Sequence, residues 1–208
     1  MKRMARARRA SAGVMRTERL GERGRFLRSF LRSPREVGAV LPTSRWAVRA
    51  MLDLALIERA SCVVEMGAGT GPYTREILRR LRPEARFLSF EIDPVLAGRL
   101  AAELRDPRLT VVNDSAEKMG SYLEGQHAQV IVSAIPFTTL PAPVRHSLLQ
   151  AAQASLTEDG TLLVLQYSPF MQGQLEGAFA SVRRRIALLN VPPAFLFACK
   201  PRSFRNGE

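Results

Sequence analysis

Three glycines at alternating positions follow a short apolar run and form the segment of the sequence best suited to chemistry. Cys62 to Met66 has the composition of a buried strand, and Gly67-Ala68-Gly69-Thr70-Gly71 comes directly after it. Glycines permit a tight turn and let backbone N–H groups approach a ligand without obstruction by a Cβ atom. The spacing is G-x-G-x-G rather than the G-x-G-x-x-G of dinucleotide enzymes, and Glu65 precedes it. The loop is therefore a candidate cofactor-binding turn, with an ordinary glycine turn as the alternative.

Acidic residues also stand where the next two expected strands end. Glu91 lies about 20 residues beyond the last loop glycine, at the end of a strand, where the ribose hydroxyls of a bound nucleoside would lie. Asp93 precedes a proline and is interpreted as the N-cap of the following helix. Asp114 follows the third expected strand, and either a contact with the same ligand or a second helix N-cap would explain it.

Short apolar runs that alternate with longer amphipathic ones must position these residues. We expect strands at 62–66, 86–91, 109–113, 129–133 and 160–167, and helices at 43–59, 71–81, 94–104 and 142–156, the first capped by Thr43 or Ser44. This alternation predicts an α/β fold with a parallel sheet covered by helices on both faces. The last two expected strands, 183–190 and 194–200, predict a hairpin that adds one antiparallel strand.

Positive charge is concentrated at the N-terminal end. The net charge is +12 over 208 residues, and residues 1–36 hold 12 Lys or Arg against three acids, which leaves +9 for this arm and +3 for residues 37–208. Such an arm usually meets phosphate, either on a nucleic acid or on an anionic membrane surface. A composition rich in Arg throughout the source genome is the alternative. We divide the chain into a basic arm at 1–36 and one domain at 37–208.

Part of the arm has the pattern of an amphipathic basic helix between residues 20 and 35. On a helical wheel one side collects apolar residues and the other collects arginines, namely Leu20, Phe26, Leu27, Phe30 and Leu31 against Arg25, Arg28, Arg32 and Arg35. Such a helix could lie in a lipid interface with its arginines at the level of the headgroups. It could equally pack on the domain and leave its basic face in water.

Composition argues against several other classes of protein. No apolar run approaches the roughly 20 residues of a membrane-spanning helix, and the arm lacks the continuous apolar segment of a signal peptide. His127 and His146 lie near no cysteine or acidic cluster, so we expect no metal site. Cys62 and Cys199 are the only cysteines, which fits a reducing, cytoplasmic setting.

Several segments together carry a more specific resemblance. They are the arm around Phe26 to Phe30, the run Val37 to Ser44, the glycine loop, Ser133 to Phe137 with Leu140-Pro141, and Asn190 to Ala194. In this combination the chain resembles, nearly end to end, the small soluble bacterial phospholipid N-methyltransferases. These belong to the class I methyltransferases that use S-adenosylmethionine, and they convert phosphatidylethanolamine towards phosphatidylcholine. Met66, Ala68 and Pro72 depart from the expected forms without touching the glycines.

The resemblance implies a Rossmann-like sheet of seven strands with one antiparallel strand, and S-adenosylmethionine as the cofactor. Asp114 would bond the adenine amino group, and Leu41 to Ser44 would close over the cofactor. The residues implied in cofactor binding are Thr43, Ser44, Glu65, Gly67, Ala68, Gly69, Thr70, Gly71, Glu91, Ile92, Asp114, Ser115 and Ser133.

The acceptor side is less defined by the sequence. Tyr73, Phe137 and Tyr167 stand at the expected ends of strands, where aromatic faces could hold a methylated, cationic amine. Core packing is the alternative for Phe137. The resemblance implies a phospholipid substrate, an anionic membrane surface as partner, and a cytoplasmic protein held peripherally at the inner face of the cell membrane.

Two other functions remain as alternatives. An RNA adenine dimethyltransferase would also suit a basic arm. However, such enzymes carry a polar residue in the fourth-strand motif, where this chain has Ala134 or Ile135 before Pro136-Phe137, and they usually add a helical RNA-binding domain, for which residues after 200 leave no room. Nucleic acid is therefore not the expected partner. The second alternative is a lipid- or nucleic-acid-binding module that keeps the fold without activity.

Overall fold

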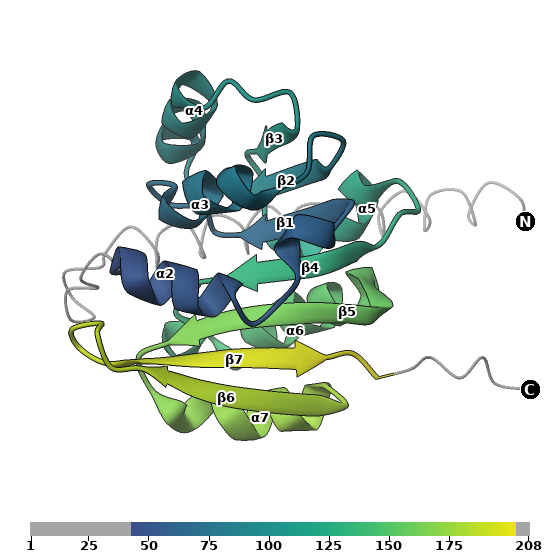
Figure 1. Ribbon diagram of the computed structural model, residues 1–208. Coiled ribbons are helices and arrows are strands. Elements are labelled where there is room, and N and C mark those ends of the chain that lie inside the picture. The colour runs from purple at the N-terminus through teal and green to yellow at the C-terminus, as the bar shows by residue number, and fades with distance from the viewer. Residues whose placement is uncertain (1–42, 203–208) are drawn as a thin grey trace, which may run out of the picture.

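The computed structural model describes residues 43–202. The basic arm at 1–36, the amphipathic helix predicted at 20–35 and the residues Leu41 and Pro42 lie outside the described residues. Within the described range seven strands form one sheet in the order β3-β2-β1-β4-β5-β7-β6 (Figure 1). The strands are β1 Cys62–Met66, β2 Arg86–Phe90, β3 Leu109–Val112, β4 Ala128–Ser133, β5 Leu156–Gln166, β6 Ser181–Ala187 and β7 Ala194–Lys200.

Strand directions confirm the predicted sheet. The pairs β1–β2, β2–β3, β1–β4 and β4–β5 are parallel, whereas β7 runs antiparallel to both of its neighbours, β5 and β6. One antiparallel strand therefore sits in an otherwise parallel, Rossmann-like sheet. Because β6 runs parallel to β5, the connection from β6 to β7 lies at the edge where β1, β4 and β5 end (Figure 1).

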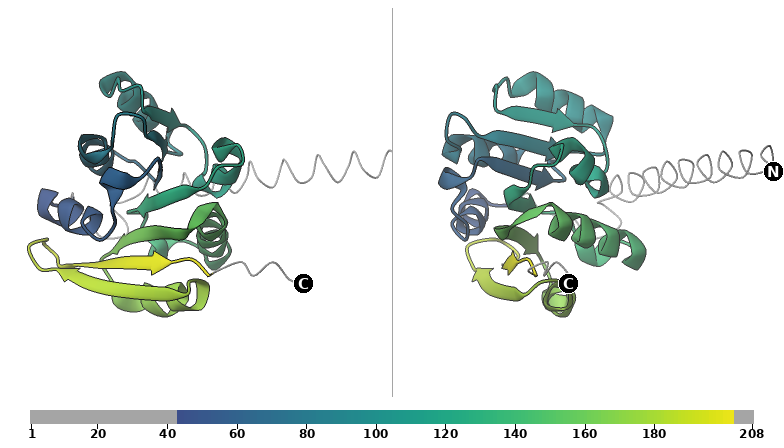
Figure 2. Two further views of the ribbon diagram at one scale, coloured as in Figure 1. Left: turned by 45° about the vertical axis from the view of Figure 1, so that its right-hand side comes forward. Right: turned by 90° about the vertical axis from the view of Figure 1, so that its right-hand side faces the viewer.

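Helices cover both faces of the sheet, as the right-hand view of Figure 2 shows. The described helices are α2 Arg45–Leu52, α3 Pro72–Arg80, α4 Pro94–Glu103, α5 Met119–Leu123, α6 Ala142–Ser155 and α7 Gln172–Ala178. Residues of α2 and α3 share one buried cluster with the alternate strand positions Val63, Val132 and Leu163. Residues of α5, α6 and α7 share the other cluster, with Val64 and Ile131. The central strands β1, β4 and β5 thus bury both faces, as strands of a parallel sheet between two helical layers do.

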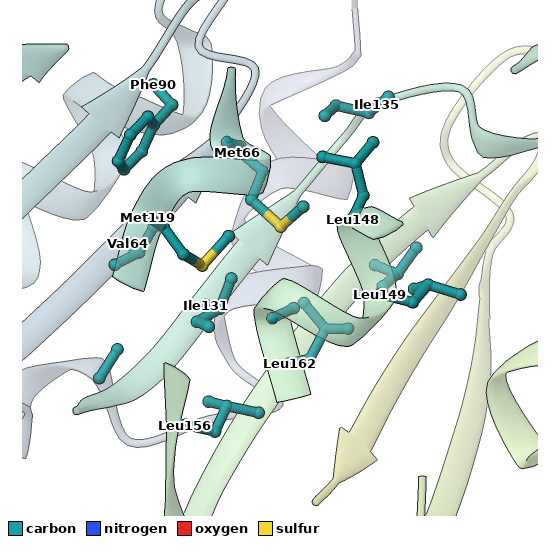
Figure 3. Close-up of a cluster of buried hydrophobic side chains, with 14 of the residues drawn as sticks. Val64, Met66, Phe90, Met119, Ile131, Ile135, Leu148, Leu149, Leu156 and Leu162 are labelled. Carbon is teal, nitrogen blue, oxygen red and sulfur yellow. The ribbon is translucent and has the colours of Figure 1, made fainter. Parts of the chain in front are cut away.

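Figure 3 shows how the second of these layers is filled. Met66 of β1 and Ile131 of β4 point towards Met119 of α5 and Leu148 of α6. All four side chains are fully buried. Such close packing fixes the ends of β1 and β4, which carry the candidate site, relative to each other.

Local signals in the sequence explain where the helices begin. The Ser44 side chain accepts the N–H of Ala47 and caps α2, and the Asp93 side chain accepts the N–H of Val95 at 2.8 Å and caps α4. Both cap predictions are confirmed. Proline stands at the first position of α3 and α4, where its fixed φ angle suits a helix and its missing N–H costs nothing.

Several sequence-based expectations differ from the structure, among them the strand expected at 183–190, which runs from Ser181 to Ala187. The helix expected at 43–59 ends at Leu52, and turns lead to a 3-10 helix, Ile57–Arg59, which buries Ile57 and returns the chain to β1. Strand β5 begins at Leu156, before the expected 160, with an irregular register opposite β4. Gly160 accommodates it, because a Cβ there would lie 2.8 Å from the Thr157 carbonyl oxygen. The short helices α5 and α7 were not predicted.

Candidate active site

The glycine loop joins β1 to α3 in a conformation that only glycine adopts without strain. Gly67, Gly69 and Gly71 have φ angles of 77°, 57° and 83°. A Cβ at Gly67 would lie 2.8 Å from Ile135 Cγ1, and one at Gly71 would overlap the side chain of Leu100. The N–H groups of Gly67 and Ala68 both donate to the Phe90 carbonyl at 2.9 Å. The loop is therefore held against the end of β2, and only at Gly69 would an added Cβ meet no other atom within 4 Å.

Glu91 follows β2 and lies against this loop. Its Oε2 accepts the N–H of Gly69 at 2.7 Å, and its Oε1 accepts the N–H of Asp93 at 2.8 Å. The residue is 7% exposed. Ile92, also predicted to bind cofactor, is half-buried beside it and packs on the core. The geometry thus holds one carboxylate in a fixed orientation at the loop.

Asp114 lies at the same edge, after β3. Burial would raise the pKa of Asp114, but hydrogen bonds from Lys118 Nζ, the Ser115 N–H and the Tyr122 hydroxyl hold it below its usual range. The Lys118 ammonium lies 2.8 Å from Oδ1, and the Tyr122 hydroxyl lies 3.0 Å from Oδ2. The side chain of Ser115, not that of Asp114, caps the 3-10 turn that follows.

Residues that the sequence reasoning missed support these two acids. The amide of Asn113 donates to the Glu91 carbonyl at 2.9 Å and so joins the ends of β2 and β3. Lys118 and Tyr122 orient the Asp114 carboxylate, and the Tyr122 ring meets the edge of Phe90. The four-residue spacing of Asp114 and Lys118 was a signal for this ion pair, since such residues are neighbours on a helix surface.

Glu65, the acid before the glycine loop, is buried between the sheet and α3. Its Oε2 accepts hydrogen bonds of 2.7 Å from the hydroxyls of Thr74 and Ser89, and its Oε1 has no partner within the described residues. Burial raises the pKa of Glu65 to about 7, while the Ser89 and Thr74 hydrogen bonds oppose the rise. Near neutral pH this carboxyl is therefore divided between its two protonation states.

Hydroxyl groups gather on the same face of the sheet as Glu65. Tyr73, at the start of α3, is 3% exposed, and its hydroxyl has no hydrogen-bond partner within residues 43–202. Burial, followed by the nearby Tyr167, raises the pKa of Tyr73 above its usual range. The Thr43 and Tyr167 hydroxyls lie 3.4 Å apart, and the Ser44 N–H donates to Asn190 Oδ1 at 2.9 Å. The structure thus brings the predicted site residues Thr43 and Tyr167 together, although 124 positions separate them in the sequence.

One predicted acceptor residue lies in the opposite layer, and one predicted cofactor residue is buried at the end of β4, where it pairs with Met66 of β1. Phe137 is fully buried in the hydrophobic cluster with α5, α6 and α7, on the face of the sheet opposite Tyr73 and Tyr167. Ser133 ends β4 and is also fully buried, with its hydroxyl 3.3 Å from the Ile135 N–H. Thr70, in the loop itself, is exposed.

Two negative observations complete the description of residues 43–202. Among these residues no three His, Cys, Asp or Glu side chains come together in a way that could hold a metal ion. No helix in this range has the length and apolar character needed to cross a membrane.

Comparison with known proteins places this geometry in context. The family described as "Methyltransferase domain" matches residues 63–160, which include most of β1, the glycine loop, Glu91 and Asp114. The chain is 27% identical over 180 residues to an ornithine lipid N-methyltransferase of Singulisphaera acidiphila, a match that covers 84% of this chain and 94% of that protein.

Of two further similarities, one covers a small part of each chain and the other has low sequence identity. A ribosomal RNA small subunit methyltransferase H of Polynucleobacter necessarius is 32% identical over 91 residues, which cover 41% of this chain and 28% of that one. The structure of the N-methyltransferase NodS from Bradyrhizobium japonicum, in complex with S-adenosyl-L-homocysteine, has a TM-score of 0.61 at 12% identity, covering 76% of this chain and 88% of that one. This last likeness concerns the fold alone.

Proposed function

The chain carries a Rossmann-like methyltransferase domain that uses S-adenosylmethionine, and from this premise we propose that it methylates the amine of a membrane lipid headgroup. Phosphatidylethanolamine and its partly methylated forms are the proposed acceptors, with phosphatidylcholine as the final product. The observation that carries the proposal is the match to a lipid N-methyltransferase over 84% of this chain and 94% of the relative. The basic arm at 1–36 supports a partner that carries phosphate.

The residues present fit the proposed cofactor. A Cβ at Gly69 would meet no other atom within 4 Å, which leaves room for a ligand at this glycine, and Glu91 beside it is proposed to bond the ribose hydroxyls. Asp114, oriented by Lys118 and Tyr122, stands at the end of β3 in the position expected to meet the adenine amino group. When bound, the cofactor supplies an electrophilic methyl group on a sulfonium. Glu65, with one unpartnered buried oxygen, offers negative charge beside a cationic ligand.

The hydroxyl groups of Thr43, Tyr73 and Tyr167 are proposed to line the acceptor pocket. Transfer of a methyl group needs an aligned nucleophile in a site without bulk water, so the main task of these residues is to position the amine. An ethanolamine amine has a reference pKa of roughly 10 and must lose a proton first. As methyl groups accumulate the amine becomes a fixed cation, which the faces of Tyr73 and Tyr167 can hold. We leave Phe137 out of this pocket because it lies in the opposite layer.

The test of this function is transfer of a labelled methyl group to defined acceptors. The full chain is incubated with S-adenosylmethionine labelled in the methyl group and with vesicles of phosphatidylethanolamine and phosphatidylglycerol, or with ribosomal RNA. We expect label in mono-, di- and trimethylated lipid and none in RNA. Label in RNA alone would refute the lipid proposal. Failure of the protein to bind S-adenosylmethionine in calorimetry would refute its assignment as a methyltransferase.

Ornithine lipid is a second candidate acceptor, since the relative with the near full-length match is named for it. Both lipids present a primary amine at the membrane surface, so the same pocket could accept either. Vesicles in which ornithine lipid replaces phosphatidylethanolamine form the third arm of the assay. Faster transfer to ornithine lipid at equal surface concentration would shift the assignment to that lipid.

A further inference from the structure

The large apolar side chains that remain exposed gather at one edge of the molecule. Within residues 43–202 eight such side chains are exposed, and seven of them lie on segments at the edge where β1, β2 and β5 end. Only Leu56, which precedes β1, lies at the opposite edge. The seven are Trp46, Val95, Phe170, Ile186, Leu188, Leu189 and Val191.

Four of these residues come from two neighbouring segments. The connection from β6 to β7 contributes Leu188, Leu189 and Val191, which are 75%, 73% and 76% exposed. Trp46 stands in the first turn of α2 and is 65% exposed. Figure 1 shows the start of α2 and the β6–β7 connection at the same end of the sheet, and the bond from the Ser44 N–H to Asn190 joins them. We call Trp46, Leu188, Leu189 and Val191 the hairpin patch.

The exposure of the hairpin patch is built into the fold. Asn190, between the exposed side chains, is 1% exposed; its Oδ1 accepts the Ser44 N–H and its Nδ2 donates to the Pro192 carbonyl at 2.7 Å. Anchoring this one polar side chain inward turns its apolar neighbours towards the outside. Burial of a Val or Leu side chain is worth about 1.5–3 kcal/mol, so an exposed group of this kind marks an interaction surface.

Charge around the patch indicates the chemistry of the partner. Residues 177–202 contain five basic side chains and no Asp or Glu. Arg184 and Arg185 are exposed on β6, and Arg45 is exposed beside Trp46. The acidic residues of this edge that the candidate site uses, Glu91 and Asp114, are held by hydrogen bonds within it. Apolar side chains beside exposed arginines complement an anionic lipid surface, where arginines meet phosphates and apolar groups enter the interface.

We propose that the hairpin patch is a membrane-docking surface that inserts into the headgroup region of an anionic bilayer, separate from the basic arm at 1–36. The proposal rests on the proposed function, because a lipid headgroup amine can reach the glycine loop only if this edge of the sheet faces the bilayer. The β6–β7 connection lies at that edge, so docking through the patch turns the opening of the site towards the lipid. The patch thereby orients the enzyme as well as holding it.

Trp46 allows a direct test, since it is the only tryptophan of the chain. Vesicles of phosphatidylethanolamine and phosphatidylglycerol are added to the full-length protein, and the emission of Trp46 is recorded together with quenching by brominated acyl chains. We expect a shift to shorter wavelength and clear quenching. Co-sedimentation with the vesicles without either change in emission would overturn the proposal.

A substitution experiment separates the patch from the arm. The triple variant Leu188→Ser, Leu189→Ser, Val191→Ser keeps Asn190 and the arm, and Leu56→Ser at the opposite edge is the control. We expect the triple variant to lose at least tenfold in vesicle partitioning and in methylation of vesicle lipid, while its binding of S-adenosylmethionine and its activity on dispersed short-chain phosphatidylethanolamine stay near wild type. Unchanged partitioning would refute the docking role.

Further outcomes would show that the patch binds something other than a membrane, or that docking and the proposed function fail independently of each other. If the wild-type chain is a dimer in solution and the triple variant a monomer, the patch is an interface between two copies and the membrane assignment is wrong. If no lipid is methylated but Trp46 still enters the bilayer and the triple variant does not bind, docking stands and only the proposed function fails. If vesicle lipid is methylated but the emission of Trp46 does not change, the proposed function stands and the docking role of the patch fails.

Discussion

At the scale of single residues, the site holds two buried carboxylates in contrasting surroundings. Glu91 accepts backbone N–H groups with both oxygens, which holds its carboxylate in a fixed direction. Glu65 receives two hydroxyl groups on one oxygen and none on the other. The first is therefore suited to hold neutral ribose hydroxyls, whereas the second is sensitive to pH and to positive charge nearby.

Replacement of Glu91 tests its assignment to the cofactor. In Glu91→Gln an amide NH2 must face either the Gly69 or the Asp93 N–H, and hydrogen bonds to charged groups are worth about 1.5–3 kcal/mol each. We expect the dissociation constant for S-adenosylmethionine, measured by calorimetry, to rise at least tenfold. Glu124→Gln, at an exposed ion pair with Arg86, is the matched control. Equal affinity in the two variants would remove Glu91 from the cofactor site.

The raised pKa of Glu65 makes a prediction about stability. Its folded value of about 7 lies above the ordinary 4.5, so between these pH values the native state keeps a proton that the unfolded chain has released. Its contribution to the free energy of unfolding is therefore complete below pH 4.5 and falls as the pH rises towards 7. The fall amounts to at most about 3 kcal/mol.

Glu65→Gln isolates this effect because a neutral amide cannot titrate. The free energy of unfolding from urea titrations, wild type minus variant, should decrease as the pH rises from acidic to neutral, while contributions from all other groups cancel. A difference that does not change with pH would show that Glu65 titrates normally in the folded protein.

At the scale of elements, hydrophobic patterning was sufficient to locate the parallel strands, apart from the start of β5, and residue type was sufficient for the caps at Ser44 and Asp93. It failed where tertiary contacts decide. Helix α7 contains two glycines within seven residues and is held by burial of Leu175, so its sequence gives little helical signal. The face on which Phe137 lies could not be read from a loop position, because no periodicity extends through the loop after β4.

The candidate site, too, could be predicted from the sequence only in part. Motif spacing placed Glu91 at the glycine loop, since the end of a strand next to β1 must lie there. The hydroxyl group of Tyr167 meets Thr43 only because β5 and the start of α2 come together in the fold. Contacts between residues this far apart have no local signal in one sequence, and the inward anchoring of Asn190 belongs to the same class.

Glycine substitutions test the connection of the loop to α3. Gly71→Ala would require an alanine at a φ of 83° and would overlap Leu100 and Arg75. The left-handed conformation alone costs roughly 1–2 kcal/mol, so we expect a larger total loss of stability in urea unfolding, with weaker binding of S-adenosylmethionine. Gly98→Ala, in α4 where a Cβ meets nothing within 4 Å, should instead stabilise the protein by about 1 kcal/mol. The same sign for both variants would contradict this account of the loop.

At the scale of the whole molecule, charge and apolar surface are distributed separately. Residues 1–36 carry +9 of the net +12, whereas the hairpin patch is apolar and lies on the folded domain at the edge of the site. Electrostatic attraction acts over a Debye length of about 10 Å at 0.1 M salt and is screened at higher concentration. Burial of apolar side chains lacks this dependence on salt. The contributions of the arm and of the hairpin patch to vesicle binding should therefore be distinguishable in a salt titration.

The quadruple variant Arg25→Gln, Arg28→Gln, Arg32→Gln, Arg35→Gln removes charge from the arm and leaves the hairpin patch intact. Each Arg near an anionic surface contributes about 1 kcal/mol at physiological ionic strength, so we expect vesicle binding to fall at least tenfold in low salt. Between low and high salt the affinity of the wild type should drop steeply and that of the quadruple variant less steeply, because its arm carries +5 instead of +9. The triple hairpin variant should keep the steep dependence of the wild type at a lower affinity throughout. If instead the hairpin variant flattens the salt response, the arm and the patch do not act as separate contacts, because apolar side chains cannot by themselves supply the screened component.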